Sequence, residues 1–152
     1  TMDSATYFKP TEVLQDQLAQ IGITAEIEKM ERGAYLSDVY SNAMYDMTVM
    51  SMVYEITDAD AIYAFFHSDM IKNGQNFFRV NNPELDKLLD QGRSSTDSNL
   101  RKQTYEKVAK LLNDEVVLIP LYSYMMGVAV NKNLKGVQAS SIQYYDVYSF
   151  SW

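Results

Sequence analysis

Three carboxylates stand within six residues of one another near the middle of the chain. They are Glu55, Asp58 and Asp60, and they directly follow an almost continuously apolar stretch, residues 45–54. Such a group could bind a cation, cap the N-terminus of a helix, or act as a catalytic acid–base pair. Helix capping by Asp58, with Asp60 in the first turn, needs no further partner and leaves Glu55 free to point elsewhere.

Glu55 follows a predicted buried strand, which is where open α/β sheets place their ligand sites. A carboxylate flanked by Met52 and Tyr54 suits a positively charged ligand group held in an otherwise apolar pocket. An enzyme that uses Glu55 together with Asp58 or Asp60 is the alternative from another class. It predicts turnover by the chain alone.

Other catalytic and metal-binding chemistry finds no support in the residue types. The only histidine, His67, stands near the end of a predicted helix, and we expect a surface or capping role for it. Cysteine is absent, so neither a second histidine nor a thiolate can help His67 hold a metal ion. There is no Gly-x-Ser-x-Gly motif and no Gly-rich phosphate loop. We therefore expect no catalytic residue, no metal ion and no cofactor.

The segments around this group alternate between helical and strand periodicity, which predicts an α/β layer structure. Pro10 is placed to start a helix whose apolar stripe is Val13, Leu14, Leu18 and Ile21. Further helices are expected over 35–40, after Asp58, after the capping residue Asn82, and over about 100–113. Strands are expected at 23–30, 45–54, 77–80, 116–124 and in the Tyr-rich tail.

Length and composition describe one globular domain. The chain has 152 residues, 47% of them hydrophobic and 22% charged. Its net charge of −7 argues against nucleic acid as a partner, because a phosphate-binding surface needs clustered Lys and Arg. The start, Thr1-Met2-Asp3-Ser4, carries no signal-peptide pattern. We expect the chain to be a piece of a longer protein.

Four stretches, in order, resemble the family 5 extracellular solute-binding proteins, the dipeptide and oligopeptide binders of ABC importers. The first is LQDQLAQIGI at residues 14–23, a helix-to-strand passage. The second is the YD strand at 45–47 leading to the Asp-Ala-Asp turn at 58–60. The third is FFRVNNPELD at 77–86. The fourth, at 96–122, combines a D-x-x-x-R-x-x-x-Y helix with a P-L-Y strand. Together they cover nearly the whole chain.

The resemblance implies a fold and a location. The fold is an α/β lobe of the type II periplasmic-binding-protein kind, a mixed sheet flanked by helices. Residues 1–152 would form a single domain, the C-terminal part of the second lobe of a longer two-lobe protein, with a tail from about 138–152 that returns toward the first lobe. The family implies no catalysis, hinge closure on the ligand, and a periplasmic or cell-surface location. A lipid anchor on the missing N-terminal part would be its only membrane attachment, and an ABC transporter permease its protein partner.

The resemblance also suggests roles for site residues. Glu55 stands where peptide binders place an Asp that pairs with the α-ammonium group of the ligand, and Met52 replaces a pocket tryptophan. Tyr54 would form a wall, and Arg32 would contact a carboxylate or another polar group. Asp58 is a further candidate ligand-binding residue. Ala59 replaces the proline of the turn. Because of these departures from the family pattern, a second solute class stays open: a nickel complex, an oligosaccharide or another non-peptide solute.

Overall fold

The computed structural model describes residues 1–52, 58–123, 127–138 and 145–152. Over these ranges the elements are helical, and most of them are short. They are α1 (Ala5–Gln20), α2 (Arg32–Tyr35), η1 (Leu36–Ser41), η2 (Ala59–Ile62), α3 (Tyr63–Phe66), α4 (Met70–Asn73), α5 (Pro83–Ser94), α6 (Ser98–Asp114) and η3 (Val147–Ser149). No described helix is both long enough and apolar enough to cross a membrane.

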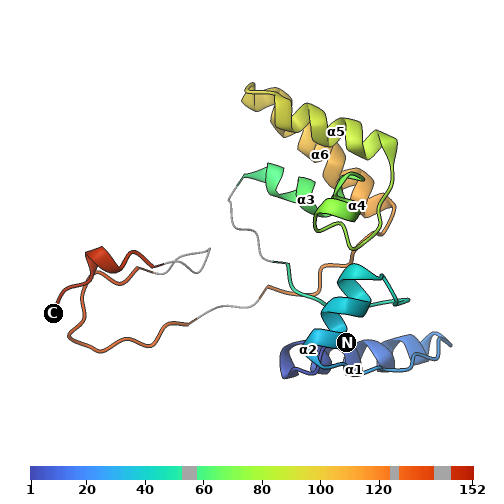
Figure 1. The fold of residues 1–152 in the computed structure, drawn as a ribbon, viewed down its shortest axis with the longest axis horizontal. Coiled ribbons are helices and arrows are strands. Elements are labelled where there is room, and N and C mark those ends of the chain that lie inside the picture. The colour runs from blue at the N-terminus through green and yellow to red at the C-terminus, as the bar shows by residue number, and fades with distance from the viewer. Residues whose placement is uncertain (53–57, 124–126, 139–144) are drawn as a thin grey trace.

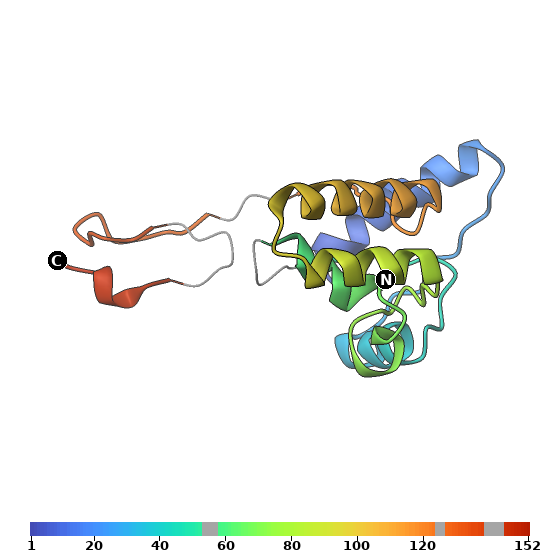
Figure 2. The ribbon, with the colours of Figure 1, turned by 90° about the horizontal axis from the view of Figure 1, so that it is seen from above.

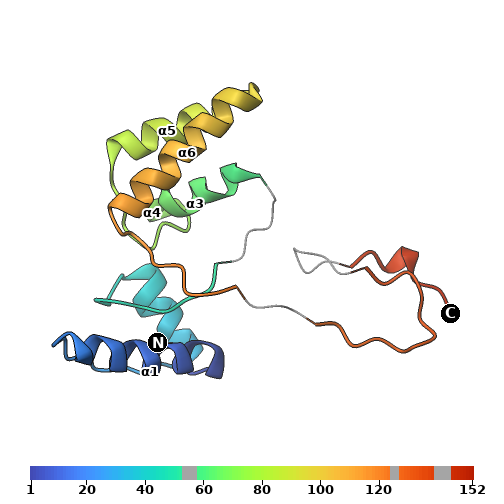
Figure 3. The same cartoon turned by 180° about the vertical axis from the view of Figure 1, so that it is seen from behind.

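The described residues fall into three regions (Figure 1). Helices α3 to α6 gather in one region, and α1 lies beside α2 in another. Extended chain after η1 and extended chain after α6 run between these regions, as the view from behind also shows (Figure 3). The C-terminal residues 127–138 and 145–152 project away from the helices as a separate arm (Figure 2).

The hydrophobic core lies between α5, α6 and α3. Leu85, Leu89 and Val108 have no exposed surface, and Phe66 is 2% exposed. Burial of this kind contributes about 25 cal/mol for each Å² of apolar surface removed from water. Helix α5 begins as the sequence predicts, because the side chain of Asn82 caps it through the Glu84 amide. Helix α6 begins at Ser98, slightly before the predicted start at about residue 100, and Asp97 caps it.

Helix α1 differs from the prediction at its start. It begins at Ala5, so that Pro10 lies inside the helix. Proline has no amide hydrogen, and the Thr6 carbonyl four residues earlier therefore loses its helical donor. The hydroxyl of Tyr122 donates to that carbonyl at 3.1 Å and replaces the missing hydrogen bond. The expected apolar stripe is not buried, since Val13 is 56% exposed and Ile21 74%.

The predicted mixed sheet is not confirmed. Within the described ranges there is no strand, only two isolated bridges, Met2 with Met30 and Lys135 with Ser151. The described parts of 23–30, 45–54 and 116–124 form no ladder. The strand at 77–80 is wrong: Phe77 lies in a turn, and Arg79 has a positive φ of 58°. The second predicted helix is confirmed as α2 and η1, with Tyr35 and Val39 buried.

Candidate functional site

The turn at residues 58–60, here called the acidic turn, is held by helices α5 and α6. The Asp58 carboxylate accepts a hydrogen bond from the Asp60 amide at 2.7 Å and pairs with Arg101 of α6 at 2.5 Å. Asp60 accepts two hydrogen bonds from Arg93 Nε and one from Nη2, at 3.0 to 3.1 Å, and one from the Tyr105 hydroxyl at 3.3 Å. The predicted cap at Asp58 is therefore present. Both of these carboxylates are engaged within the chain.

These contacts shift the ionisation of the groups involved. The pKa of Asp58 is lowered, first by the hydrogen bond from the Asp60 amide and then by Arg101. The pKa of Arg93 is raised by its hydrogen bonds to Asp60. Burial raises the pKa of Tyr105 and that of Tyr63, whose ring lies 3.5 Å from the Arg93 guanidinium. In the acidic turn two carboxylates thus face two arginine side chains.

Asp58→Asn is expected to lower stability at neutral pH more than in acid. A carboxyl whose pKa is lower in the folded state adds stability that is fully present above about pH 4, the unfolded value, and is lost as the pH falls through the folded value. Urea unfolding of both proteins at pH 7 and pH 3 measures the difference. Asp16→Asn, on the exposed side of α1, is the matched control. An equal loss at both pH values would contradict the prediction.

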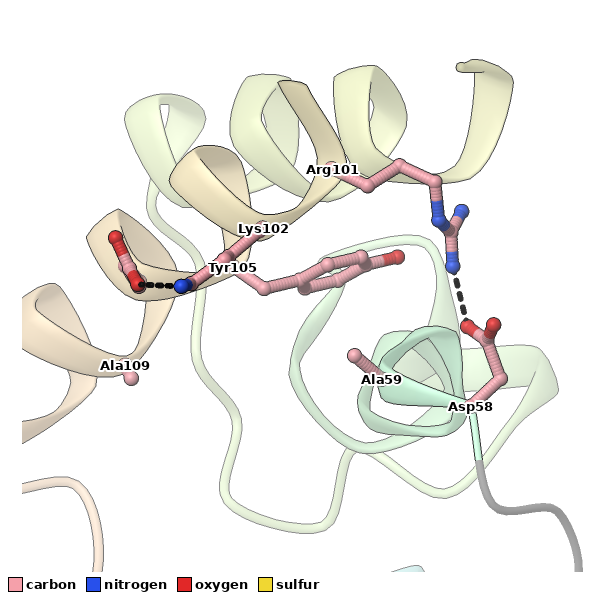
Figure 4. Close-up of a pocket in the computed structure, with 7 residues that line it drawn as sticks. Asp58, Ala59, Arg101, Lys102, Tyr105 and Ala109 are labelled. Atoms are coloured by element: carbon pink, nitrogen blue, oxygen red, sulfur yellow. Dashed lines mark hydrogen bonds and ion pairs between the residues drawn. The ribbon is translucent and has the colours of Figure 1, made fainter. Parts of the chain in front are cut away.

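A shallow groove of about 520 Å³ opens between the acidic turn and α6 (Figure 4). Its lining is mixed in charge and consists of Asp58, Ala59, Arg101, Lys102, Tyr105, Glu106 and Ala109. Figure 4 shows the Tyr105 ring directed from α6 toward the acidic turn. Gly92 of α5 makes this possible, because a Cβ there would stand 2.7 Å from the Tyr105 ring. Arg101 also donates to the Gly92 carbonyl at 2.6 Å, which fixes α5 against α6.

The sequence-predicted ligand residues are only partly brought together. Glu55 and Tyr54 lie outside the described residues. Met52 is half-buried and packs against the hydrophobic core. Asp58 is at the groove, whereas Arg32 is exposed and lines a second pocket.

That second pocket has a volume of about 170 Å³ and is called the tyrosine pocket below. It is lined by Met2, Tyr7, Arg32, Tyr35, Leu36, Tyr40 and Met50. It lies where the start of α1, the α2–η1 helix and the segment leading to Met52 meet. The motif analysis singled out Arg32 alone. For the three tyrosines of the lining, the one available signal was the high tyrosine content of the chain, 12 of 152 residues.

His67 occupies a different environment from the one the sequence suggests. It is 5% exposed, so a surface position is wrong, although its Nδ1 accepts a hydrogen bond from the Asp69 amide just before α4. Its ring stacks on Tyr63 with 4.3 Å between centroids. Its Nε2 is 3.6 Å from Asp90 and 3.9 Å from Asp86. Within the part of the chain that is described, no group of three His, Asp or Glu side chains is arranged to hold a metal ion.

Solved structures define the fold class. The chain superposes with a TM-score of 0.80 on a dipeptide-binding protein from Pseudoalteromonas in complex with Met-Leu, over 93% of this chain and 28% of that one, at 23% identity. It superposes with a TM-score of 0.75 on the oligopeptide-binding protein AppA of Bacillus subtilis in complex with a nonapeptide, over 98% and 30%, at 21% identity. A third, AgaA with agropinic acid, gives 0.57 over 67% and 21%, at 26% identity. The described residues thus have the backbone arrangement of part of a periplasmic peptide-binding protein.

Sequence relatives agree, although no family model matches the chain. It is 28% identical over 124 residues to the oligopeptide-binding protein AppA of Bacillus subtilis, which is 82% of this chain and 23% of that protein. It is 27% identical over 130 residues (85% and 24%) to a probable di/tripeptide-binding protein of Pseudomonas aeruginosa. It is 28% identical over 133 residues (87% and 24%) to the peptide transport periplasmic protein SapA of Salmonella typhimurium.

The resemblance predicted from the four motifs is confirmed. The homologues of this chain are oligopeptide- and dipeptide-binding proteins of the family 5 solute-binding type. The chain spans about a quarter of the length of these curated relatives.

Proposed function

We propose that this chain forms most of one lobe of an extracytoplasmic protein that captures peptides and delivers them to an ABC importer. The observation that carries the proposal is the match to peptide-binding proteins over more than four fifths of the chain. A second lobe in the longer protein would close on the ligand by a hinge motion. The bound peptide would then lie between the two lobes.

The extended segments support this assignment to a larger assembly. Ile119 is 70% exposed and Val130 48%, although both lie in apolar segments that the sequence predicts to be extended. In the longer protein we expect these segments to join a mixed sheet. We expect the tail from about 138–152 to run toward the other lobe. Residues 1–152 would then be one domain of that protein.

In this proposal the carboxylate of Glu55 binds the ammonium group of the ligand. The two neighbouring carboxylates, Asp58 and Asp60, are each paired with an arginine of the same chain. Their charges therefore stabilise the acidic turn. Met52 and Tyr54 would form apolar walls beside Glu55, and Arg32 would contact a carboxylate or polar group. Asp58 contributes mainly by fixing the end of the segment that carries Glu55.

Glu55→Gln in the full-length protein is expected to weaken binding of short peptides by about 10- to 150-fold. A hydrogen bond to a charged group is worth about 1.5–3 kcal/mol, and each 1.4 kcal/mol is a factor of ten. Isothermal titration with mixed short peptides measures the change. Glu12→Gln, an exposed glutamate of α1, is the matched control and should bind like the wild type. Equal affinities of the wild type and Glu55→Gln would remove Glu55 from this role.

A non-peptide solute is the second candidate, and the match to AgaA in complex with agropinic acid favours it. In that case Glu55 does not bind the solute, and tyrosine rings stack on it, as they would on a sugar or a nickel chelate. A thermal-shift screen of the full-length protein against peptides, sugars and metallophores separates the two. Neither candidate is an enzyme, and the isolated chain should show no turnover.

The proposed location follows from the relatives, one of which is named as periplasmic. The longer protein would work in the periplasm or as a cell-surface lipoprotein, attached to the membrane only through a lipid anchor on its N-terminal part. Its protein partner would be the ABC transporter permease. Nucleic acid is not a partner, given the net charge of −7.

A further inference from the structure

Hydrogen bonds hold two of the tyrosine side chains that line the tyrosine pocket. The Tyr35 hydroxyl lies 3.0 Å from Thr48 Oγ1 and 3.2 Å from the Val49 carbonyl, to which it donates. The Tyr7 hydroxyl lies 2.7 Å from Ser51 Oγ. These contacts tie the walls to the segment that leads directly to Met52. A pocket whose side chains are already ordered loses little entropy when a ligand enters.

The rings offer mainly apolar surface to an occupant. Tyr35 is 2% exposed, and burial raises its pKa to about 12, so its hydroxyl stays protonated and bound to Thr48 and Val49. The Tyr40 ring is packed 4.5 Å from Phe77 and 6.0 Å from Tyr35, measured between centroids. Met2, Leu36 and Met50 complete the lining with apolar groups.

Size and charge limit what fits. A cavity of about 150 Å³ is enough to hold a benzene ring, and the tyrosine pocket measures about 170 Å³. Arg32 is the one ionised side chain among its lining residues, and none of them is acidic. A guanidinium group binds carboxylates through two parallel hydrogen bonds. The pocket therefore suits an apolar side chain whose neighbouring group is an anion.

We propose that the tyrosine pocket takes one apolar side chain, of leucine or phenylalanine size, from a residue whose carboxylate is held by Arg32. This inference rests on the proposed function and assigns the pocket to the C-terminal residue of the bound peptide. Apolar C-terminal residues would be preferred over glycine.

The 152-residue chain contains all seven lining residues, so it should bind a small probe without the rest of the protein. N-acetyl-leucine, followed by NMR, is expected to give saturable shifts of the Tyr7, Tyr35 and Tyr40 ring signals and of the Met50 methyl group. N-acetyl-leucinamide, which lacks the carboxylate, and the Arg32→Gln chain should each bind about tenfold more weakly. N-acetylglycine should also be weaker.

Leu36→Trp fills the pocket and should abolish these shifts. Leu121→Trp should leave them unchanged, because Leu121 has a similar exposure (44% against 41%) but is not among the lining residues. Absence of saturable shifts, or equal binding of the acid and the amide, would overturn the proposal. If that happens while Glu55→Gln still weakens peptide binding by the full-length protein, the peptide-binding function stands and only the subsite is lost. If instead N-acetyl-leucine binds as expected and Glu55→Gln leaves the peptide affinity unchanged, the subsite is supported and the role of Glu55 is not.

Discussion

Leu89→Ala is expected to lower the free energy of unfolding by about 2–5 kcal/mol. Leu89 has no exposed surface and belongs to the same core cluster as Leu85, Val108 and Phe66. The loss combines the transfer free energy of the removed methyl groups with the cost of the cavity that remains, because helices α5 and α6 can collapse only partly onto it. Since these two helices also hold the acidic turn, their loosening should reach the candidate site.

Urea unfolding followed by the helical circular dichroism signal measures this effect. Leu100→Ala is the matched control, because Leu100 lies on α6 but is 38% exposed and should lose less than about 1 kcal/mol. A similar loss in both variants would mean that α5 and α6 do not form the core described here. An unchanged slope with denaturant would show that the same surface is exposed on unfolding.

The long helices could be predicted from the sequence because their signals are local. Asn82 followed by Pro83 fixes the start of α5 with a side-chain cap, and the apolar stripe over about 100–113 predicts α6, although not its cap at Asp97. The start of α1 could not be predicted in the same way. Proline usually marks a helix start, and Pro10 lies inside the helix in a structure where Tyr122, 116 residues from Thr6, supplies the missing donor. A contact of that sequence separation leaves no local pattern.

The candidate site shows the same division between local and distant contacts. Capping by Asp58 with Asp60 in the first turn follows from spacing alone, and the structure has it. The partners Arg93 and Arg101 stand 33 and 43 residues away from the carboxylates they bind, and the sequence gives no reason to pair them. The burial of His67 was missed because it depends on stacking against Tyr63 and on packing near α5.

The predicted strands depend on distant partners, whereas the predicted helices do not. A strand is stabilised by its neighbour, so apolar extended sequences such as 116–123 show their pairing only when the neighbour is present. The helices, whose hydrogen bonds are internal, need no such partner. This difference explains why the helical predictions are largely confirmed while the mixed sheet is not.

The failed strand prediction at residues 77–80 has a different cause. A buried side chain in the turn after α4 overrides the apolar pattern of these residues. Asn76 is 1% exposed, and its amide nitrogen donates to the His67 carbonyl at 3.0 Å and to the Val80 carbonyl at 2.9 Å. Its Oδ1 accepts from the Val80 amide at 3.1 Å. Arg79 extends the same arrangement by donating to the Ile71 carbonyl at 2.9 Å. One amide side chain thus folds the segment between α4 and α5.

Asn76→Ala is therefore expected to cost roughly 3–5 kcal/mol of stability. It leaves two backbone carbonyls and one backbone amide without their side-chain partner, and an unsatisfied buried polar group costs about 1–3 kcal/mol. Asn76→Asp should be similarly damaging despite its matching shape, because a carboxylate cannot donate to the carbonyls of His67 and Val80.

Urea unfolding measures the loss, and hydrogen exchange at the Val80 amide should rise in both variants because its acceptor is lost or displaced. Asn99→Ala is the matched control, since Asn99 is exposed on α6 and alanine favours the helix. If Asn76→Ala cost less than about 1 kcal/mol, water or neighbouring groups would be satisfying these backbone groups. The turn would then be set by the packing of Phe77 and by Arg79 rather than by the Asn76 amide.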